Sequence, residues 1–335
     1  MRRALTNVTF ICIAMLVALA TSVGYAECNR CIGQRCPDSC QYDCGGFYGG
    51  IEYLFLKPRT SGLDFAIADP NTDDNIQGPI ELLELDAKSG VRASFGRATA
   101  SGWDFGFTYT SFESNAAKSV DAPTGGQLWL TRTNPASFNN AATAADANAD
   151  LDYQVLDCHA ARWVHPNDCT AIRLFGGPRA AWIDQAMEVE YTGGTVGGTR
   201  TQSQTTKMDG FGARFGGEGH WWMNDCVSFF GSAAGSVLVG DFAIRHIELE
   251  PGLSTGNVDT TTNYYDAVTG IDVAFGMQVT GRRLSLQTGY ELTSWLNLDQ
   301  RVNYVGTSTV ALGNQAMTSR DLVLDGLFVR FILHR

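Results

Sequence analysis

Nine charged residues of this 335-residue chain lie on the polar face of segments whose opposite face is apolar. Successive side chains of a β-strand point to opposite faces, so such a segment presents its charges on one side only. If the apolar faces meet lipid, the charges must face water or one another. They would then line a lumen and act on passing ions through a transverse electric field, or fill the lumen with ion pairs and conduct nothing. The nine lumen or constriction residues are Glu52, Arg92, Arg173, Arg179, Arg214, Glu218, Asp272, Glu291 and Arg330.

Two further acidic residues have an ambiguous phase. Asp157 falls on the same face as Tyr153 and Val155, and Asp325 falls with Leu327 and Val329. The sequence assigns neither of them to the lumen.

Hydrolytic chemistry has little support in the sequence. It would need a histidine near carboxylates at the outer end of a strand. Of the five histidines only His246, with Asp241 and Glu248 nearby, meets this condition, and such a neighbourhood arises easily by chance in an acidic chain. The stretch "AAGSVLVG" does not match the nucleophile motif G-x-S-x-G. We therefore predict no enzyme, no catalytic residue and no cofactor.

The stretch "GWDFGFTYTSF" illustrates the elements that must position the charges. Large aromatic residues alternate with small or polar ones from Trp103 to Tyr109, a period typical of a strand. Glycine is abundant, with 37 residues, and only 18% of the chain is charged, so the composition favours an all-β fold. Ten such segments are expected, at 46–57, 88–98, 102–113, 150–163, 170–192, 207–222, 226–244, 262–279, 283–297 and 320–334.

The connections between these segments alternate in length. Short turns follow the second, fourth, sixth and eighth segments, whereas a sandwich would space its turns more evenly. Long polar loops follow the others, at 58–87, 114–149, 193–206, 245–261 and 298–319. This alternation is typical of bacterial outer-membrane barrels with both termini on the inner side. We predict a transmembrane antiparallel up-and-down β-barrel of about ten strands, or twelve if a long strand hides a hairpin.

Local features of the loops and turns carry smaller expectations. The tract "NPASFNNAATAADANAD" in the 114–149 loop lacks periodicity and is predicted to be mobile. The acidic 58–87 loop is interpreted as a solvated surface rather than a calcium site. Four tryptophans beside short turns could form an aromatic girdle at the inner interface or could pack on their neighbours. They are Trp103, Trp163, Trp221 and Trp222.

The N-terminus is typical of an exported protein. Arg2 and Arg3 precede the apolar run "TFICIAMLVALA" and a small-residue exit, which predicts a signal peptide over residues 1–26. Its removal changes the formal charge from −11 to −13, which argues against a nucleic-acid partner. We expect a Cys-rich periplasmic segment at 27–45 and the barrel at 46–335.

The mature chain keeps eight of the nine cysteines, since Cys12 lies in the signal peptide. An even number in an exported chain favours disulfides. Cys28 and Cys31 resemble half of a zinc site, but no second C-x-x-C motif or nearby histidine completes it, so no metal is predicted. The disulfide candidates are Cys28, Cys31, Cys36, Cys40, Cys44, Cys158, Cys169 and Cys226.

Strand-like fragments from about residue 46 to the C-terminus resemble, in order, a known family. They include "FYGGIEYLFLK", "GVRASFG", "GWDFGFTYTSF", "LDYQVLD", "IRLFGGPRAAWI", "GFGARFGGEGHW", "FFGSAAGSVLVGDF", "LQTGYELTSWLNL" and "DLVLDGLFVRF". The set is similar to the Legionella-type major outer membrane protein family, pore-forming barrels with planctomycete-like relatives. The resemblance implies an outer-membrane location and a porin-like role, and it supplies no catalytic residues. The chain departs from the usual barrel pattern at its end, where Phe331 lies four residues before the C-terminus.

The sequence thus supports two functions. The first is passive passage of small hydrophilic solutes or ions through a barrel in contact with outer-membrane lipid. The alternative is a non-conducting structural or adhesive barrel that presents acidic extracellular loops. The sequence also leaves open a homo-oligomer or disulfide-linked neighbours as partners.

Overall fold

The computed structural model describes residues 46–73, 75–133, 141–167, 169–196, 198–224, 226–249, 258–281, 283–304 and 315–334. The predicted signal peptide and Cys-rich segment lie outside these residues. Among the described residues, no helix has the length and apolarity needed to cross a bilayer.

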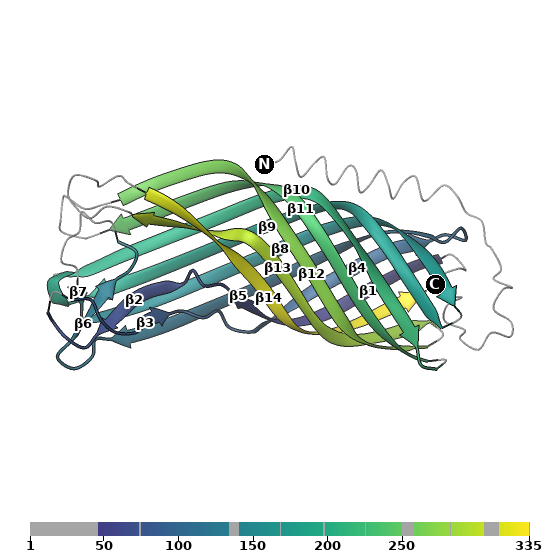
Figure 1. Ribbon diagram of the computed structural model, residues 1–335, viewed down its shortest axis with the longest axis horizontal. Helices are drawn as coiled ribbons and strands as arrows, with labels where there is room; N and C mark the ends of the chain where they lie inside the picture. The colour runs from purple at the N-terminus through teal and green to yellow at the C-terminus, as the bar shows by residue number, and fades with distance from the viewer. Residues whose placement is uncertain are drawn as a thin grey trace.

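Ten antiparallel strands close into a barrel, which confirms the predicted fold class and strand number (Figure 1). Around the barrel the order is β1-β14-β13-β12-β11-β10-β9-β8-β5-β4. The short β4–β5, β8–β9, β10–β11 and β12–β13 connections lie at the end that carries the C-terminus, as predicted. The strands are β1 (Gly46–Arg59), β4 (Lys88–Ala98), β5 (Trp103–Asp121), β8 (Ala144–Asn167), β9 (Thr170–Thr192), β10 (Thr199–Trp222), β11 (Val227–Leu249), β12 (Val258–Thr280), β13 (Leu284–Tyr304) and β14 (Gln315–His334).

Most strands extend further towards the outer end than the sequence predicted. The predicted segments ended where the outward face stops being apolar, but the ladders continue. In β8, for example, Ala145, Ala147 and Ala149 are buried inside, while Asp146 and Asp150 face out. The described part of the Ala/Asn/Asp tract is therefore strand rather than mobile loop. Small alanines gave too weak an apolar signal to reveal the alternation.

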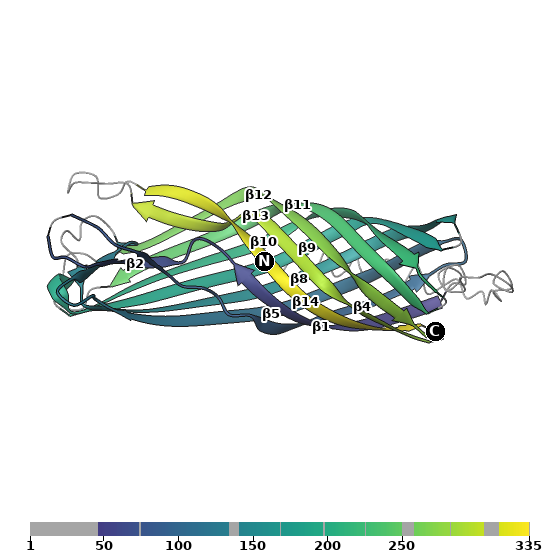
Figure 2. The ribbon, with the colours of Figure 1, turned by 60° about the horizontal axis from the view of Figure 1, so that its bottom comes forward.

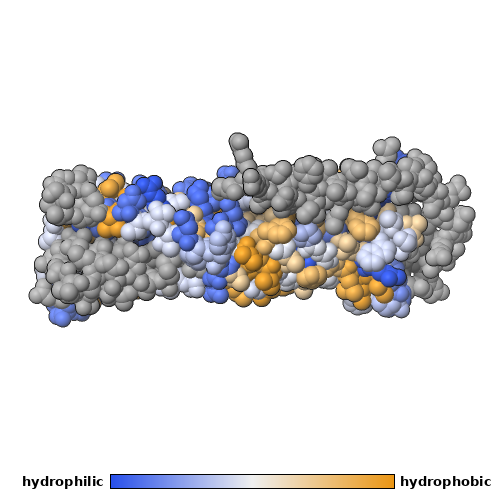
Figure 3. All heavy atoms as spheres, turned by 90° about the horizontal axis from the view of Figure 1, so that it is seen from above, coloured by the Kyte–Doolittle hydropathy of each residue, from blue (hydrophilic) through white to orange (hydrophobic). Residues whose placement is uncertain are grey.

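A continuous apolar belt surrounds the inner half of the barrel. We define it as the outward-facing side chains between an inner edge at Arg162 and Trp221 and an outer edge at Asp152 and Asp209. The ten-residue step along β8 from Arg162 to Asp152 rises about 25 Å, at about 3.3 Å per residue and a tilt of about 40°. This is the height of the lipid-facing band of membrane barrels. Figure 3 shows the hydrophobic residues of one face gathered over the inner half and hydrophilic ones towards the outer end.

A charge at mid-belt should destabilise the barrel if this face meets hydrocarbon. Phe215 is 66% exposed and lies midway between Asp209 and Trp221 on β10. We expect Phe215→Arg to lower the free energy of unfolding by about 2–4 kcal/mol, and Trp221→Arg at the belt edge by about 0–1 kcal/mol. Guanidinium unfolding in lipid vesicles, followed by heat-modifiable electrophoretic mobility, measures both. Equal losses at the two positions would show that the face does not lie in hydrocarbon.

The predicted tryptophan girdle is only half present. Trp103 and Trp221 face outward at the inner edge of the belt, 42% and 63% exposed. Trp163 and Trp222 instead point into the barrel, where the Trp222 ring stacks on His220 and the Trp163 ring lies tilted against it. Parity decides this, because Trp221 and Trp222 are consecutive in one strand and must face opposite sides.

A second, four-stranded sheet fills the outer end, and the sequence did not predict it. It has the order β3-β2-β6-β7, and it comes from the two long loops after β1 and β5 (all four strands are labelled in Figure 1, and β2 also in Figure 2). Its strands are β2 (Asp64–Asp69), β3 (Ile80–Leu82), β6 (Gln127–Leu130) and β7 (Ala141–Ala142). We call it the outer sheet. Phe65 and Leu128 of this sheet are fully buried in the core that it shares with the inward-facing residues of the barrel wall.

Candidate functional site

The inner half of the lumen holds a cavity of about 200 Å³. All nine charged residues singled out in the sequence line it, and they come from seven strands. Asp104, Asp157, His159 and Tyr48 line it too, although the sequence analysis did not select them. Asp104 carried a usable signal, because it alternates with the aromatic face of "GWDFGFTYTSF".

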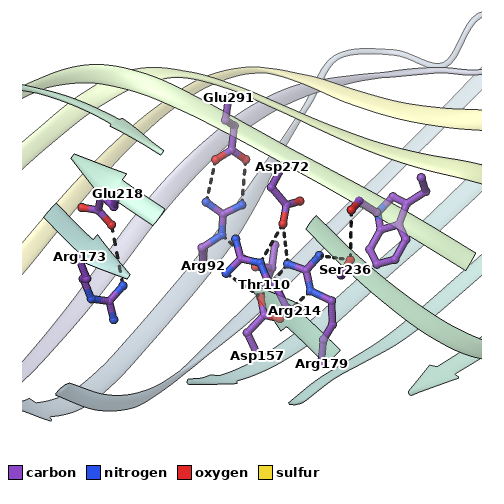
Figure 4. Close-up of polar contacts among 12 residues, drawn as sticks. Arg92, Thr110, Asp157, Arg173, Arg179, Arg214, Glu218, Ser236, Asp272 and Glu291 are labelled. Atoms are coloured by element: carbon purple, nitrogen blue, oxygen red, sulfur yellow. Dashed lines mark hydrogen bonds and ion pairs between the residues drawn. The ribbon is translucent and has the colours of Figure 1, made fainter. Parts of the chain in front are cut away.

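A first cluster forms around Glu52 of β1. The ladders place Arg330 of β14 and Arg92 of β4 directly opposite Glu52 on its two sides. Arg92 Nη1 donates to Glu52 Oε1 at 2.6 Å, and Arg330 Nε donates to Oε2. The Arg92 guanidinium group also donates two hydrogen bonds, at 2.8 and 2.9 Å, to the two carboxylate oxygens of Glu291 on β13 (Figure 4). Gln287 accepts from Arg330 at 2.9 Å. Register alone therefore brings one carboxylate between two guanidinium groups.

A second cluster is centred on Arg179 of β9. Arg179 donates to both oxygens of Asp157, its ladder partner on β8, at 2.6 and 3.0 Å. Its Nη2 also lies 2.9 Å from Asp272 Oδ2, and Nη1 lies 3.2 Å from Ser236 Oγ. Arg214 Nε donates to the same Asp272 oxygen at 2.9 Å (Figure 4). Two arginines thus share two carboxylates, and the four side chains come from four strands.

A third cluster lies nearest the inner end. Arg173 donates to Asp104 at 2.8 Å and lies 3.9 Å from Glu218, its ladder partner. Tyr48 donates to Asp104 at 2.7 Å. His220 Nε2 is 2.6 Å from Glu218 Oε1. Together the three clusters contribute six carboxylates and five guanidinium groups to the cavity wall, so the charge of the cavity is nearly balanced.

The structure resolves the two residues of ambiguous phase. Asp157 faces the lumen. Tyr153 and Val155 lie on the same face of the strand, because the lumen becomes apolar towards its outer end. Asp325 faces outward near the outer edge of the belt, where Arg59 Nε donates to it at 2.5 Å. Tyr290 also donates to Asp325. In these two strands the apolar side chains lie on the outward face in the inner half of the barrel and on the inward face in the outer half. A single alternation pattern therefore could not be assigned to either strand from the sequence.

Above the charged clusters the lumen is crossed by what we call the apolar layer. Its side chains are no more than 1% exposed and come from the barrel wall. Trp295 lies in contact with the charged region, since the Arg179 guanidinium carbon is 5.5 Å from its ring centroid. Its indole donates to Tyr153 Oη at 3.3 Å. The layer consists of Leu54, Phe112, Met208, Leu238, Phe242, Trp295, Leu322, Leu324 and Phe328.

The outer sheet is tied to the barrel by side chains that bond to its main chain or to the loops that carry it. Tyr191 Oη donates to the carbonyl oxygen of Phe65 at 2.5 Å, and Gln202 Nε2 donates to that of Arg132 at 2.5 Å. Arg132 Nε in turn donates to the carbonyl of Asp64 at 2.7 Å. The outer end is closed by a separate element that is anchored at several points.

Asp69 makes the outer sheet sensitive to acid. The backbone amide of Asn71 donates to its buried carboxylate at 3.0 Å and lowers its pKa, helped by the Trp129 indole at 2.9 Å. The folded pKa lies below the unfolded value of about 3.9. The ionised Asp69 carboxylate therefore stabilises the folded outer sheet above that pH, and this stabilisation is lost as the pH falls through the folded pKa.

We expect deuterium exchange of residues 64–69, corrected for intrinsic rates, to be faster at pH 3 than at pH 6. In Asp69→Asn the corrected protection should be lower at pH 6 and nearly independent of pH, because no charge is lost. Equal pH dependence in both proteins would contradict this role of Asp69.

The structure separates His246 from one of its two acidic neighbours in sequence. His246 and Glu248 are both buried on the inward face of β11, whereas Asp241 faces outward on the same strand. Within the described residues, no group of three or more His, Cys, Asp or Glu side chains is arranged to hold a metal ion.

Three disulfide candidates lie on the barrel. Cys226 carries an exposed free thiol. Cys158 and Cys169 are separated by about 30 Å along the β8–β9 ladder, at about 3.3 Å per residue, so they cannot bond to each other. The candidates from Cys28 to Cys44 lie outside the described residues, so disulfide pairing stays a prediction.

A comparison of the sequence with models of known protein families identifies the family of this chain. The model of the Legionella pneumophila major outer membrane protein precursor matches residues 43–334, nearly the whole chain. The chain belongs to this family. It is therefore an outer-membrane protein in contact with lipid, as the apolar belt requires. A comparison with curated protein sequences gave no significant match.

Solved structures with a similar arrangement are distant. The outer membrane protease OmpT from Escherichia coli is 8% identical, with a TM-score of 0.49, over 87% of this chain and 97% of that one. A Pseudomonas aeruginosa FadL homologue is 6% identical, with a TM-score of 0.24, over 94% and 95%. The toluene transporter TodX of Pseudomonas putida is 7% identical, with a TM-score of 0.21, over 93% and 95%. At these levels the likenesses carry no argument about activity.

Proposed function

We propose that the barrel is a gated passage for small hydrophilic solutes or ions and that the conformation described here is its closed state. One observation supports this most strongly. A charged cavity in the inner half of the lumen lies in line with an outer half that is closed by a separate sheet, not only by wall strands.

The cavity suits small, hydrated solutes. A cavity of about 200 Å³ has room for several water molecules. Carboxylates and guanidinium groups on opposing walls set a transverse field across this space, and we assign the constriction to the nine residues predicted from the sequence. A closed apolar layer above it would gate by excluding water.

A non-conducting structural or adhesive barrel is the second candidate. It is supported by the ion pairing of all five lumenal arginines and by the apolar layer, which together fill the lumen as small barrels commonly do. The outward acidic residues above the belt would then be the functional surface.

Single-channel recording in planar bilayers separates the two candidates. The passage predicts discrete, salt-dependent current steps, whereas silence from folded protein supports the structural barrel. Arg214 is the test residue, because its side chain is 24% exposed while that of Arg179 is only 4% exposed. We expect Arg214→Glu to shift the reversal potential in a KCl gradient towards cation selectivity.

The matched control is Lys207→Glu, which makes the same charge change on the outside of the barrel. An unchanged reversal potential in Arg214→Glu, relative to this control, would remove Arg214 from the constriction.

A further inference from the structure

We propose that the inner edge of the apolar belt binds the phosphate of an anionic phospholipid through Arg97 and Arg162. This site lies on the outer surface of the barrel and does not depend on whether the lumen conducts.

The two arginines stand out by their position. Across the outward faces of the described belt, every residue between its two edges is uncharged. At the inner edge the ionised residues on these faces are Arg97 of β4 and Arg162 of β8. At the outer edge the ionised residues are mostly acidic. The distribution is asymmetric, and the positive side chains are concentrated next to β5.

Each guanidinium group lies over an aromatic ring of the neighbouring strand. The Arg97 guanidinium carbon is 5.2 Å from the Phe47 ring centroid, and that of Arg162 is 5.8 Å from the Trp103 centroid. The ladders fix this arrangement, because Arg97 is opposite Phe47 and Phe105, and Arg162 is opposite Trp103. The rings hold the cations at the belt edge and partly shield them from water, which strengthens their attraction to an anion.

The spacing suits one lipid headgroup. Strands β4 and β8 flank β5, so the two Cα atoms are about 10 Å apart across the sheet and about 7 Å apart along it. Arg162 lies over Trp103 on the side that faces Arg97, whereas Arg97 lies over Phe47 on the other side of β4, so the Arg97 side chain must turn towards β5 to bind the same phosphate. One guanidinium group can donate two parallel hydrogen bonds to two oxygens of the same phosphate, which the ammonium group of lysine cannot do. The acyl chains of the same lipid would lie along the aromatic face directly above, which a free phosphate could not use.

Native mass spectrometry of the mature full chain can test this proposal. The protein is released from nanodiscs that contain equal amounts of phosphatidylglycerol and phosphatidylcholine, and the ratio of retained lipids is measured. We expect a preference for phosphatidylglycerol that falls about fivefold with each of Arg97→Gln and Arg162→Gln, as expected for loss of one interfacial cation. Lys57→Gln, which removes an outward cation at the outer edge, should leave the ratio unchanged.

A ratio in the Arg97→Gln/Arg162→Gln double variant equal to that in Lys57→Gln would overturn the proposal. A competition experiment on the unmodified protein keeps the test valid if a variant does not fold. Displacement of phosphatidylglycerol by millimolar inorganic phosphate would identify a soluble anion as the ligand and would also overturn the lipid assignment, whereas retention of the lipid supports it.

Discussion

Arg179→Ala is expected to lower the free energy of unfolding by about 3–5 kcal/mol, because removal of one partner from a buried ion pair leaves uncompensated charge. Arg179 is 3% exposed and contacts the carboxylates of Asp157 and Asp272. In the variant, Arg214 stays close to Asp272 at 2.9 Å but lies 3.9 Å from Asp157. Asp157 therefore loses its near partner, and Arg179→Ala combined with Asp157→Asn should recover part of the loss.

Guanidinium unfolding in lipid vesicles provides the measurement. Lys207→Ala is the matched control, because Lys207 and Asp184 form a pair of similar length, 2.9 Å, with both side chains exposed. Such exposed pairs contribute about 0–1 kcal/mol. If both variants lost the same stability, the lumenal cluster would not be a buried network.

Trp295→Ala is expected to raise the open frequency of the barrel, so that conducting steps become more frequent than in the unmodified protein. Trp295 is fully buried in the apolar layer and lies directly over the Arg179 guanidinium group. Removal of the indole opens space between the charged cavity and the outer half of the lumen. Water can then enter a region that the apolar layer keeps dry. Planar-bilayer recording at fixed salt measures the open frequency and the conductance.

Phe275→Ala provides the matched control for this prediction. Phe275 is also a large aromatic residue, but it is 60% exposed on the lipid-facing side of β12. Its removal should leave the currents unchanged. Unchanged currents in Trp295→Ala, with folding verified by electrophoretic mobility, would show that the apolar layer does not control passage.

Period-two alternation was enough to predict the barrel. The alternation in "GWDFGFTYTSF" and in the last half of β12 gave the strands, and the short and long connections gave the up-and-down order. The same alternation identified the polar face of most strands, so that the nine charged residues could be chosen before any contact was known.

Pairing across the barrel left no local signal in the sequence. Arg92 and Glu291 are 199 residues apart, and they meet because the closed ladder brings β4 and β13 to opposite sides of β1. The outer sheet is similar, since β2 and β6 come from different loops and pair through residues such as Ile67 and Trp129. Neither segment shows more than a few residues of alternation.

The sequence by itself determined which side of most strands is apolar, because adjacent side chains must point to opposite faces. Only the tertiary structure decided which charges pair and where the lumen closes. Both depend on strand register around a closed ring and on loops that fold back into its mouth. Those positions are set by contacts between residues far apart in the chain.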